Sequence, residues 1–168
     1  LSLVGSEMCI RDSLLAMVVE RHGKNGNIGY GFLTGSCLKK GTVATTYFHD
    51  HHNLFVAGSS PDDMLFAVNR IRELQGGFLT VKDGRILSEL ALPVCGLLSE
   101  KSIRENGLAL KAVRKSLTDL GYVHNNPIMS VATLGLPVSP ALKLTDKGLV
   151  DVKKGEIVPL IVNTKKNK

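Results

Sequence analysis

Three of the five histidines fall within four consecutive positions, and this stretch holds the residues best able to do chemistry. Its sequence is Phe48-His49-Asp50-His51-His52-Asn53, and it is named here the histidine corner. Imidazole titrates near neutral pH, donates or accepts hydrogen bonds, and binds metals. Apolar, β-prone residues lie on both sides, at 43–47 and 54–57, which predicts a polar corner between two strands. We therefore expect any bound ligand to be held here.

The residues alone leave three interpretations of the corner open. His49 and His51 would share a face of a strand, as in metal-binding HxH pairs, but outside the corner only His22 and His124 remain as further histidine ligands. Alternatively, the corner hydrogen-bonds a polar ligand, with Asp50 orienting an imidazole. In the third interpretation, the polar side chains satisfy main-chain groups at a buried turn, as buried polar atoms usually must.

Composition places the chain among ordinary globular domains. Its 168 residues, 43% hydrophobic and 21% charged, predict one domain with a real core. The net charge of +6 is modest, and no basic face is interleaved with aromatics, so we expect no nucleic-acid partner. No apolar run reaches the roughly 18 residues of a membrane span, so we expect no membrane partner. Cys9, Cys37 and Cys95 are far apart, which predicts free thiols in a reducing compartment, the cytoplasm.

Hydrophobic periodicity predicts two main helices. The first covers 61–74, with Ser60 as its cap, and the second covers about 100–120, with Ser99 as its cap. Asp83-Gly84 marks a tight turn between two strands. Short strands are predicted near 14–21, 28–33, 41–48, 53–57, 78–81, 85–90, 128–134, 142–144 and 158–162. About eight short strands in a mostly antiparallel, layered sheet with two main helices favour an α+β fold.

The two ends of the chain differ from the part between them. Residues 1–13 have neither helical nor strand periodicity and resemble translated adaptor read-through, so we expect a foreign or disordered leader before Leu14. We expect one domain over 14–162, followed by a mobile basic tail over 163–168. On this interpretation the chain is the C-terminal remnant of something longer.

The order of the motifs carries a family resemblance. The run Val19-Glu20-Arg21-His22, the run Gly26-Asn27-Ile28-Gly29-Tyr30-Gly31-Phe32 and the histidine corner closely resemble the C-terminal domain of adenine deaminase. Further matching motifs are Asp62-Asp63-Met64 with Ala67-Val68-Asn69-Arg70, Leu92-Pro93-Val94 with Gly96-Leu97, and the segment from Leu142 to Asp151. The resemblance covers 14–160, in order and with matching gaps.

The resemblance implies a chemistry that this chain does not complete alone. Adenine deaminases belong to the amidohydrolase superfamily and convert adenine to hypoxanthine and ammonia. A barrel domain carries their two-metal site, usually manganese or iron, and that barrel is absent from this chain. Position 51 is more often serine in the family, so we do not expect His51 to be an essential ligand. We therefore expect no metal and no catalytic residue in this chain, and no activity without the barrel.

The resemblance suggests a place for the corner. We expect His49, Asp50, His52 and Asn53 to face the barrel and help close or line the adenine pocket. Asp50 would fix a histidine tautomer or accept a purine N–H, and Asn53 offers a donor and an acceptor together.

Glu20, Arg21 and His22 are weaker candidates for the same pocket, and a structural ion pair is the alternative for them. The expected partners are adenine, the barrel domain of the same enzyme and further copies in a homo-oligomer.

A rival interpretation is a non-catalytic module for packing or oligomerisation. It predicts a large exposed apolar face with the histidine corner away from it. The pocket interpretation predicts that the corner and the apolar face adjoin.

Overall fold

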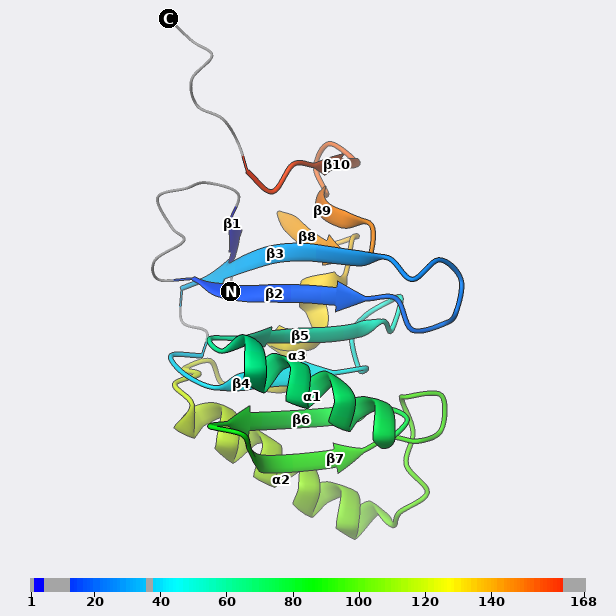
Figure 1. Cartoon of the computed structure of the whole chain (residues 1–168), viewed down its shortest axis with the longest axis vertical. Coiled ribbons are helices and arrows are strands. Elements are labelled where there is room, and N and C mark those ends of the chain that lie inside the picture. Colours follow the sequence, from blue (N-terminus) through cyan, green and yellow to red (C-terminus); the bar gives the residue numbers. More distant parts are fainter. Residues whose placement is uncertain (1, 5–12, 36–37, 162–168) are drawn as a thin grey trace, which may run out of the picture.

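The computed structural model describes residues 2–4, 13–35 and 38–161, and within them a single large antiparallel sheet forms the centre of the molecule (Figure 1). Its seven strands lie in the order β1-β3-β2-β5-β4-β6-β7. Their bounds are β1 (Ser2–Val4), β2 (Leu14–Val19), β3 (Ile28–Thr34), β4 (Thr42–Thr45), β5 (Leu54–Gly58), β6 (Gly77–Lys82) and β7 (Arg85–Ala91). Every neighbouring pair is antiparallel, so strand ends alternate along each edge of the sheet.

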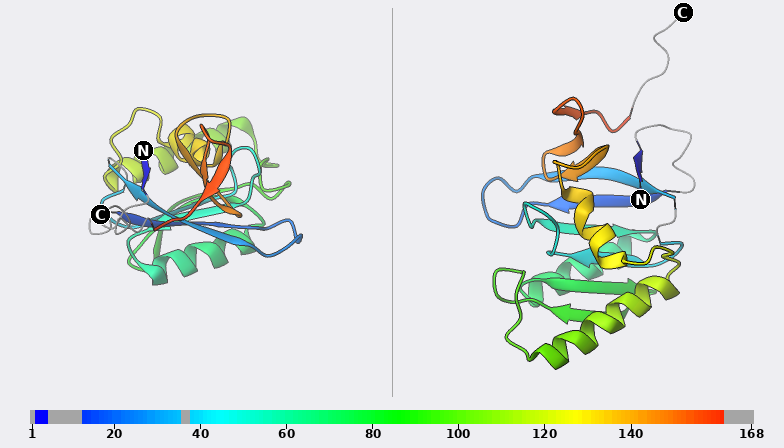
Figure 2. Two further views of the ribbon diagram at one scale, coloured as in Figure 1. Left: turned by 90° about the horizontal axis from the view of Figure 1, so that it is seen from above. Right: turned by 180° about the vertical axis from the view of Figure 1, so that it is seen from behind.

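The two faces of the sheet are covered differently. Helix α1 (Pro61–Glu73) packs on one face, against β4, β5 and β6. The other face carries helices α2 (Ile103–Asp119) and α3 (Pro127–Ala132), a 3-10 turn η2 (Thr133–Gly135) and a second sheet (Figure 2). That second sheet, in the order β10-β9-β8, consists of β8 (Leu142–Thr145), β9 (Gly148–Asp151) and β10 (Glu156–Val158). The result is a three-layer arrangement with one sparsely covered face.

Helix α1 forms where its sequence predicts it. The Ser60 hydroxyl accepts the Asp63 N–H at 3.4 Å, and Pro61 occupies the first turn. Met64 and Ile71 are buried against the sheet. The buried Asp63 carboxylate accepts the N–H of Gly84 at 2.8 Å, in the turn between β6 and β7. The start of the helix is therefore tied to a hairpin about twenty residues away.

Two apolar clusters fill the layers. The larger lies between the sheet and the α2 side, where the rings of Phe48 and Phe55 stack with centroids 4.6 Å apart. The smaller lies under α1 and contains Leu79 and Val56. Phe48 belongs to the histidine corner and is fully buried, so it anchors the corner in the core.

The α+β class and the mostly antiparallel sheet are confirmed, with ten strands in the described residues. The predicted strand over 128–134 is wrong, because α3 and η2 occupy it. Asn126 accepts the Met129 N–H at 3.4 Å, and Pro127 starts the helix, so a cap signal outweighed the apolar run. Helix α2 is capped by Ser102 rather than Ser99, since Ser102 forms a capping box with Glu105.

Both ends of the chain also differ from expectation. Ser2–Val4, placed in a leader without strand periodicity, forms β1 and pairs with β3 along the edge of the main sheet. The last strand is Glu156–Val158 rather than 158–162. The basic tail, Cys9 and Cys37 lie outside the described residues.

Glycine in β3 lets the two sheets approach closely. A Cβ on Gly29 would overlap the carbonyl oxygen of Thr145, which lies at the end of β8. By contrast, Gly107, inside α2, has no heavy atom within 4 Å of a Cβ placed there. Gly29 is therefore required by packing, whereas Gly107 is not.

We predict opposite effects from alanine at these two glycines. Gly29→Ala forces the sheets apart and lowers the free energy of unfolding by about 1–3 kcal/mol. Gly107→Ala restores helix propensity and raises the free energy of unfolding by about 0.5–1 kcal/mol. Urea denaturation of both variants measures the difference, and a destabilisation of similar size in both would contradict the packing argument.

Candidate functional site

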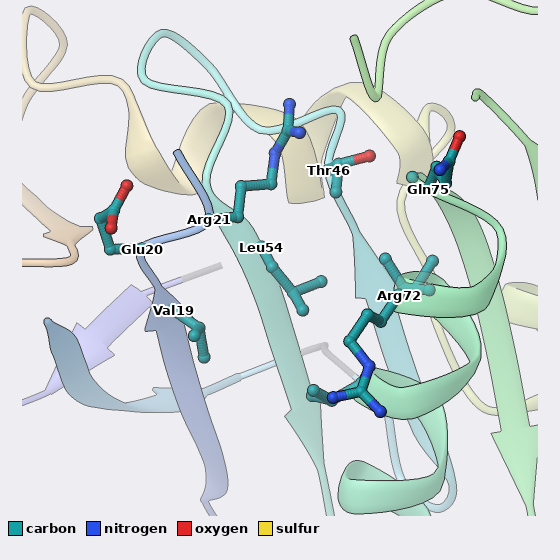
Figure 3. A pocket seen from close by; sticks show the side chains of 10 residues that line it. Val19, Glu20, Arg21, Thr46, Leu54, Arg72 and Gln75 are labelled. Carbon is teal, nitrogen blue, oxygen red and sulfur yellow. The ribbon is translucent and has the colours of Figure 1, made fainter. Parts of the chain in front are cut away.

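One edge of the main sheet gathers nearly all the candidate residues. Strands β2, β4 and β7 end there, and β5 and β6 begin there. The loops at this edge bring together four segments far apart in the sequence: 20–27, 46–53, 74–76 and 92–98. We call this region the polar edge, and Figure 3 views part of it. Alternating strand directions thus place Glu20, Arg21 and His22 beside the histidine corner.

The histidine corner is held from within but stays open to the outside. The His49 N–H donates to the Ala132 carbonyl at 2.9 Å, and the His52 N–H donates to the Phe48 carbonyl at 2.9 Å. The side chain of His49 is 24% exposed and that of Asp50 is 68% exposed. Their Nδ1 and Oδ1 atoms are 3.9 Å apart, beyond hydrogen-bond distance. The corner is therefore an anchored loop with accessible polar groups.

Arg21 clamps two loops of the polar edge together. Its Nε donates to the His52 carbonyl at 2.5 Å and its Nη2 to the Cys95 carbonyl at 2.6 Å. Gly96 lies against the guanidinium, since a Cβ there would be 2.6 Å from Nη2. Burial lowers the pKa of Arg21, partly offset by Cys95, but a guanidinium stays charged. Through this Arg21 clamp, the loop after β2 holds His52, 31 residues away in the sequence, and Cys95, 74 residues away.

Asn53 is buried in the support of the corner. It is 3% exposed, and its Oδ1 accepts the Arg21 N–H at 3.4 Å. Its own N–H donates to His51 Nδ1 at 3.2 Å. Nε2 of His22 lies 2.9 Å from the His51 carbonyl oxygen. These contacts fix the second half of the corner against the loop after β2.

Glu20 organises its own loop, and its bonding partners are main-chain groups rather than Arg21. Its carboxylate accepts four main-chain N–H groups, from His22 at 2.5 Å, Lys24 at 3.0 Å, Asn25 at 3.3 Å and Gly26 at 3.2 Å. Burial raises the pKa of Glu20, but these donors outweigh it, and the pKa is lowered overall. The alternative of a structural role fits Glu20, with main-chain partners in place of a cation.

The rings at the corner form a cluster. The ring of His49 lies 4.8 Å from that of Tyr47 and 5.3 Å from that of His52, both edge-on. The buried Nδ1 of His52 has no hydrogen-bond partner in the described part of the chain. Burial, His49 and Arg21 lower the pKa of His52, which favours the neutral form of its ring. A neutral imidazole has one donor and one acceptor, which suits recognition of a polar ligand.

His51 and Asn53 of the corner line a polar hollow. A polar cavity of about 480 Å³ is lined by Glu20, His22, Lys24, Asn25, His51, Asn53, Asp146 and Lys147. Burial lowers the pKa of His51, opposed in part by the Leu144 main chain and by Asp146. Asp146, in the turn between β8 and β9, therefore lies beside the corner.

An apolar cavity adjoins the polar edge on the α1 side. It has a volume of about 380 Å³, and its walls include Val19, Leu54, Val68 and Ile71. Arg21, Thr46 and Gln75 line its polar end (Figure 3). Thr46 is buried and donates to the Gly96 carbonyl at 2.7 Å, so this end is rigidly built. The apolar cavity and the polar edge are thus neighbours.

Sequence reasoning missed Gln75 and Cys95. Each has a left-handed backbone, with φ of 59° and 57°, and His52 on the same edge has φ of 49°. Asp83 is the fourth non-glycine residue of this kind in the described ranges. Such conformations cost energy and gather at functional sites. Neither residue carried a sequence signal, because each depends on a neighbouring loop.

The described residues contain no group of three or more His, Cys, Asp or Glu side chains that could hold a metal ion. Cys95 is a free, exposed thiol. Within the described ranges, no helix combines the length and the apolar character needed to cross a membrane.

Comparison with known proteins shows which family the chain belongs to. The family profile described as adenine deaminase C-terminal domain matches residues 4–156. The adenine deaminase of Clostridium perfringens is 50% identical over 146 residues, which cover 87% of this chain and 26% of the relative. Adenine deaminase 2 of Shouchella clausii is 49% identical over 154 residues, which cover 92% of this chain and 27% of the relative. The adenine deaminase of Brucella abortus is 47% identical over 148 residues, which cover 88% of this chain and 26% of the relative.

The fold and the polar edge thus define an α+β domain found within larger enzymes. The chain belongs to the adenine deaminase C-terminal domain family. It spans about a quarter of the length of the relatives that it matches.

We predict that Arg21→Lys loosens both clamped loops at once. An ammonium group cannot reproduce the two-pronged contact, and losing one charge-assisted bond costs about 1.5–3 kcal/mol of unfolding free energy. Amide hydrogen exchange should accelerate in 46–53 and in 92–98. Arg72→Lys, an exposed position beside the same cavity, is the control and should change neither loop. Faster exchange in a single loop would contradict a clamp.

Proposed function

We propose that this chain is the C-terminal domain of an enzyme that hydrolyses adenine to hypoxanthine and ammonia. Its polar edge faces the catalytic domain and helps close or line the purine pocket. The observation that carries the proposal is the state of the corner: the side chains of His49 and Asp50 are partly exposed and not hydrogen-bonded to each other. They lie on the same sheet edge as Arg21 and Thr46, which line the apolar cavity. The names of the relatives supply the reaction and the substrate.

The corner has the chemistry that a purine requires. Ring nitrogens of adenine accept hydrogen bonds, or donate one in a given tautomer, and a mismatched buried partner costs about 1–3 kcal/mol. The imidazoles of His49 and His52 provide donors and acceptors, and Asp50 accepts a purine N–H. Asn53 supports the loop from its buried position, so we assign it a positioning role. Arg21, Glu20 and His22 likewise act through the loops that they hold.

The metal chemistry belongs to the other domain in this proposal. The described residues offer no metal-binding cluster, so the expected manganese or iron is assigned to the catalytic domain. The metal supplies the activated water for hydrolysis. This chain contributes by orienting the ring and excluding bulk water, and it has no deaminase activity without that domain.

The rival function is a packing or oligomerisation module of the same enzyme. It requires the histidine corner to lie away from the exposed apolar surface. The cavity lined by Val19, Leu54 and Val68 instead reaches Arg21, and Arg21 donates a hydrogen bond to the His52 carbonyl of the corner. Apolar surface therefore adjoins the corner through Arg21, which favours the pocket role. A homo-oligomer and a cytoplasmic location stay predictions.

The proposal predicts a kinetic defect from His49→Ala and from Asp50→Asn. We suggest a chimera that joins residues 13–161 of this chain to the remaining three-quarters of the Clostridium perfringens enzyme. Loss of a substrate contact should lower kcat/KM for adenine by about tenfold, equivalent to about 1.4 kcal/mol. The melting temperature and metal content should not change.

His124→Ala provides the matched control, because His124 is exposed on a loop away from the polar edge. It should leave kcat/KM unchanged. If instead His49→Ala and Asp50→Asn preserve kcat/KM but lower the melting temperature, the corner is structural and the pocket role is wrong.

A further inference from the structure

In strand β3 the glycines face the covered side of the sheet, and large apolar side chains face the open side. An ordinary surface strand instead presents polar side chains to the open side. Along Ile28-Gly29-Tyr30-Gly31-Phe32, the glycines face the second sheet, where the chain is covered. The large apolar residues point to the other face. There Ile28 is 44% exposed and Tyr30 is 47% exposed. A strand facing water normally alternates with polar residues on the wet side.

The neighbouring strand extends this apolar surface. The register pairs Val19 with Ile28, Met17 with Tyr30 and Leu15 with Phe32, so each pair lies on one face. Leu15, Met17 and Val19 are partly buried against the cluster under α1. We call these six residues the β2–β3 stripe. Figure 1 shows α1 crossing β4, β5 and β6, while no helix of the described ranges crosses in front of β2 and β3.

The stripe is also free of charge. Neither β2, with the sequence LLAMVV, nor β3, with the sequence IGYGFLT, contains a charged residue. Sheet faces that meet water usually carry polar residues, and contiguous exposed apolar patches mark interaction sites. Val19 belongs to the stripe and also lines the apolar cavity, together with Val68 of α1. The stripe and that cavity therefore form one continuous surface.

We propose that the β2–β3 stripe is the surface on which this domain docks to the catalytic domain of the same enzyme. The inference rests on the proposed function, because that function names the occupant. Two observations select the catalytic domain over a second copy. The matched relatives are about four times longer than the aligned part, and the stripe runs through Val19 into the cavity that meets the polar edge. Docking on the stripe therefore brings the corner to the domain boundary.

The test compares one charge substitution in two settings. Tyr30→Asp is made in this chain alone and in the chimera described above. Because Tyr30 is half exposed, the melting temperature of the lone chain should change little, whereas in the chimera the introduced carboxylate would be buried at the boundary. We expect the chimera to lose about 5 °C or more in melting temperature and to be cut faster by protease between its domains. Met17→Ser serves as a second variant without added charge and should show the same contrast more weakly.

Val138→Asp is the control, at a residue 76% exposed in the loop before β8. It should leave both proteins unchanged. Equal destabilisation of the lone chain and the chimera by Tyr30→Asp would overturn the proposal, since the stripe would then serve the domain's own fold. A lone chain that is dimeric and becomes monomeric with Tyr30→Asp would assign the stripe to a second copy and also overturn it. If Tyr30→Asp leaves the melting temperature of the chimera unchanged while His49→Ala lowers its kcat/KM, the proposed docking surface is wrong and the proposed function stands.

Discussion

The rest of the polar edge depends on the hydrogen bonds that the Arg21 guanidinium donates. It donates to the carbonyls of His52 and Cys95, which lie in two loops far apart in the sequence. Main-chain carbonyls at such loops need donors when water is partly excluded, and a charged fork supplies two from one side chain. Because the main chain is held this way, the loop does not need the side chains of His49 and Asp50 for its own support. In the proposed function, Arg21 thereby leaves these two residues available for contact with the catalytic domain or its substrate.

Strand direction explains why such a clamp exists. In an all-antiparallel sheet, every second strand ends at the same edge, so β2, β4 and β7 deliver their following loops to one place. Phe48 anchors the corner in the core, and Thr46 ties the end of β4 to Gly96. The polar loops thus rest on buried, rigid supports, which is how binding residues are usually positioned.

Much of this architecture could be predicted from local signals. Periodicity and the Ser60 and Pro61 signals located α1, and Asp83-Gly84 located the hairpin, because these features depend on neighbours in sequence. The prediction for 128–134 was wrong because a short buried helix and a strand share an apolar pattern, and the cap at Asn126 decides between them.

The position of the candidate site could be predicted from the sequence, but the role of each residue in it could not. The histidine density marked the corner, and the structure brings Glu20, Arg21 and His22 beside it. Sequence offered no way to see that Asn53 is buried while Asp50 is exposed, or that Glu20 serves main-chain donors. Gln75 and Cys95 were missed because their positions follow from contacts between distant loops. Long-range packing, unlike periodicity, leaves no local pattern in the sequence.

The polar edge, in the proposed function, faces the purine pocket of the complete enzyme. Hydrogen–deuterium exchange on the chimera, with and without saturating adenine or a non-hydrolysable analogue, tests this placement directly. We expect slower exchange in 47–53 when the ligand binds, with no change in the hairpin at 82–85. Unchanged exchange across 47–53, with protection confined to the catalytic domain, would contradict it.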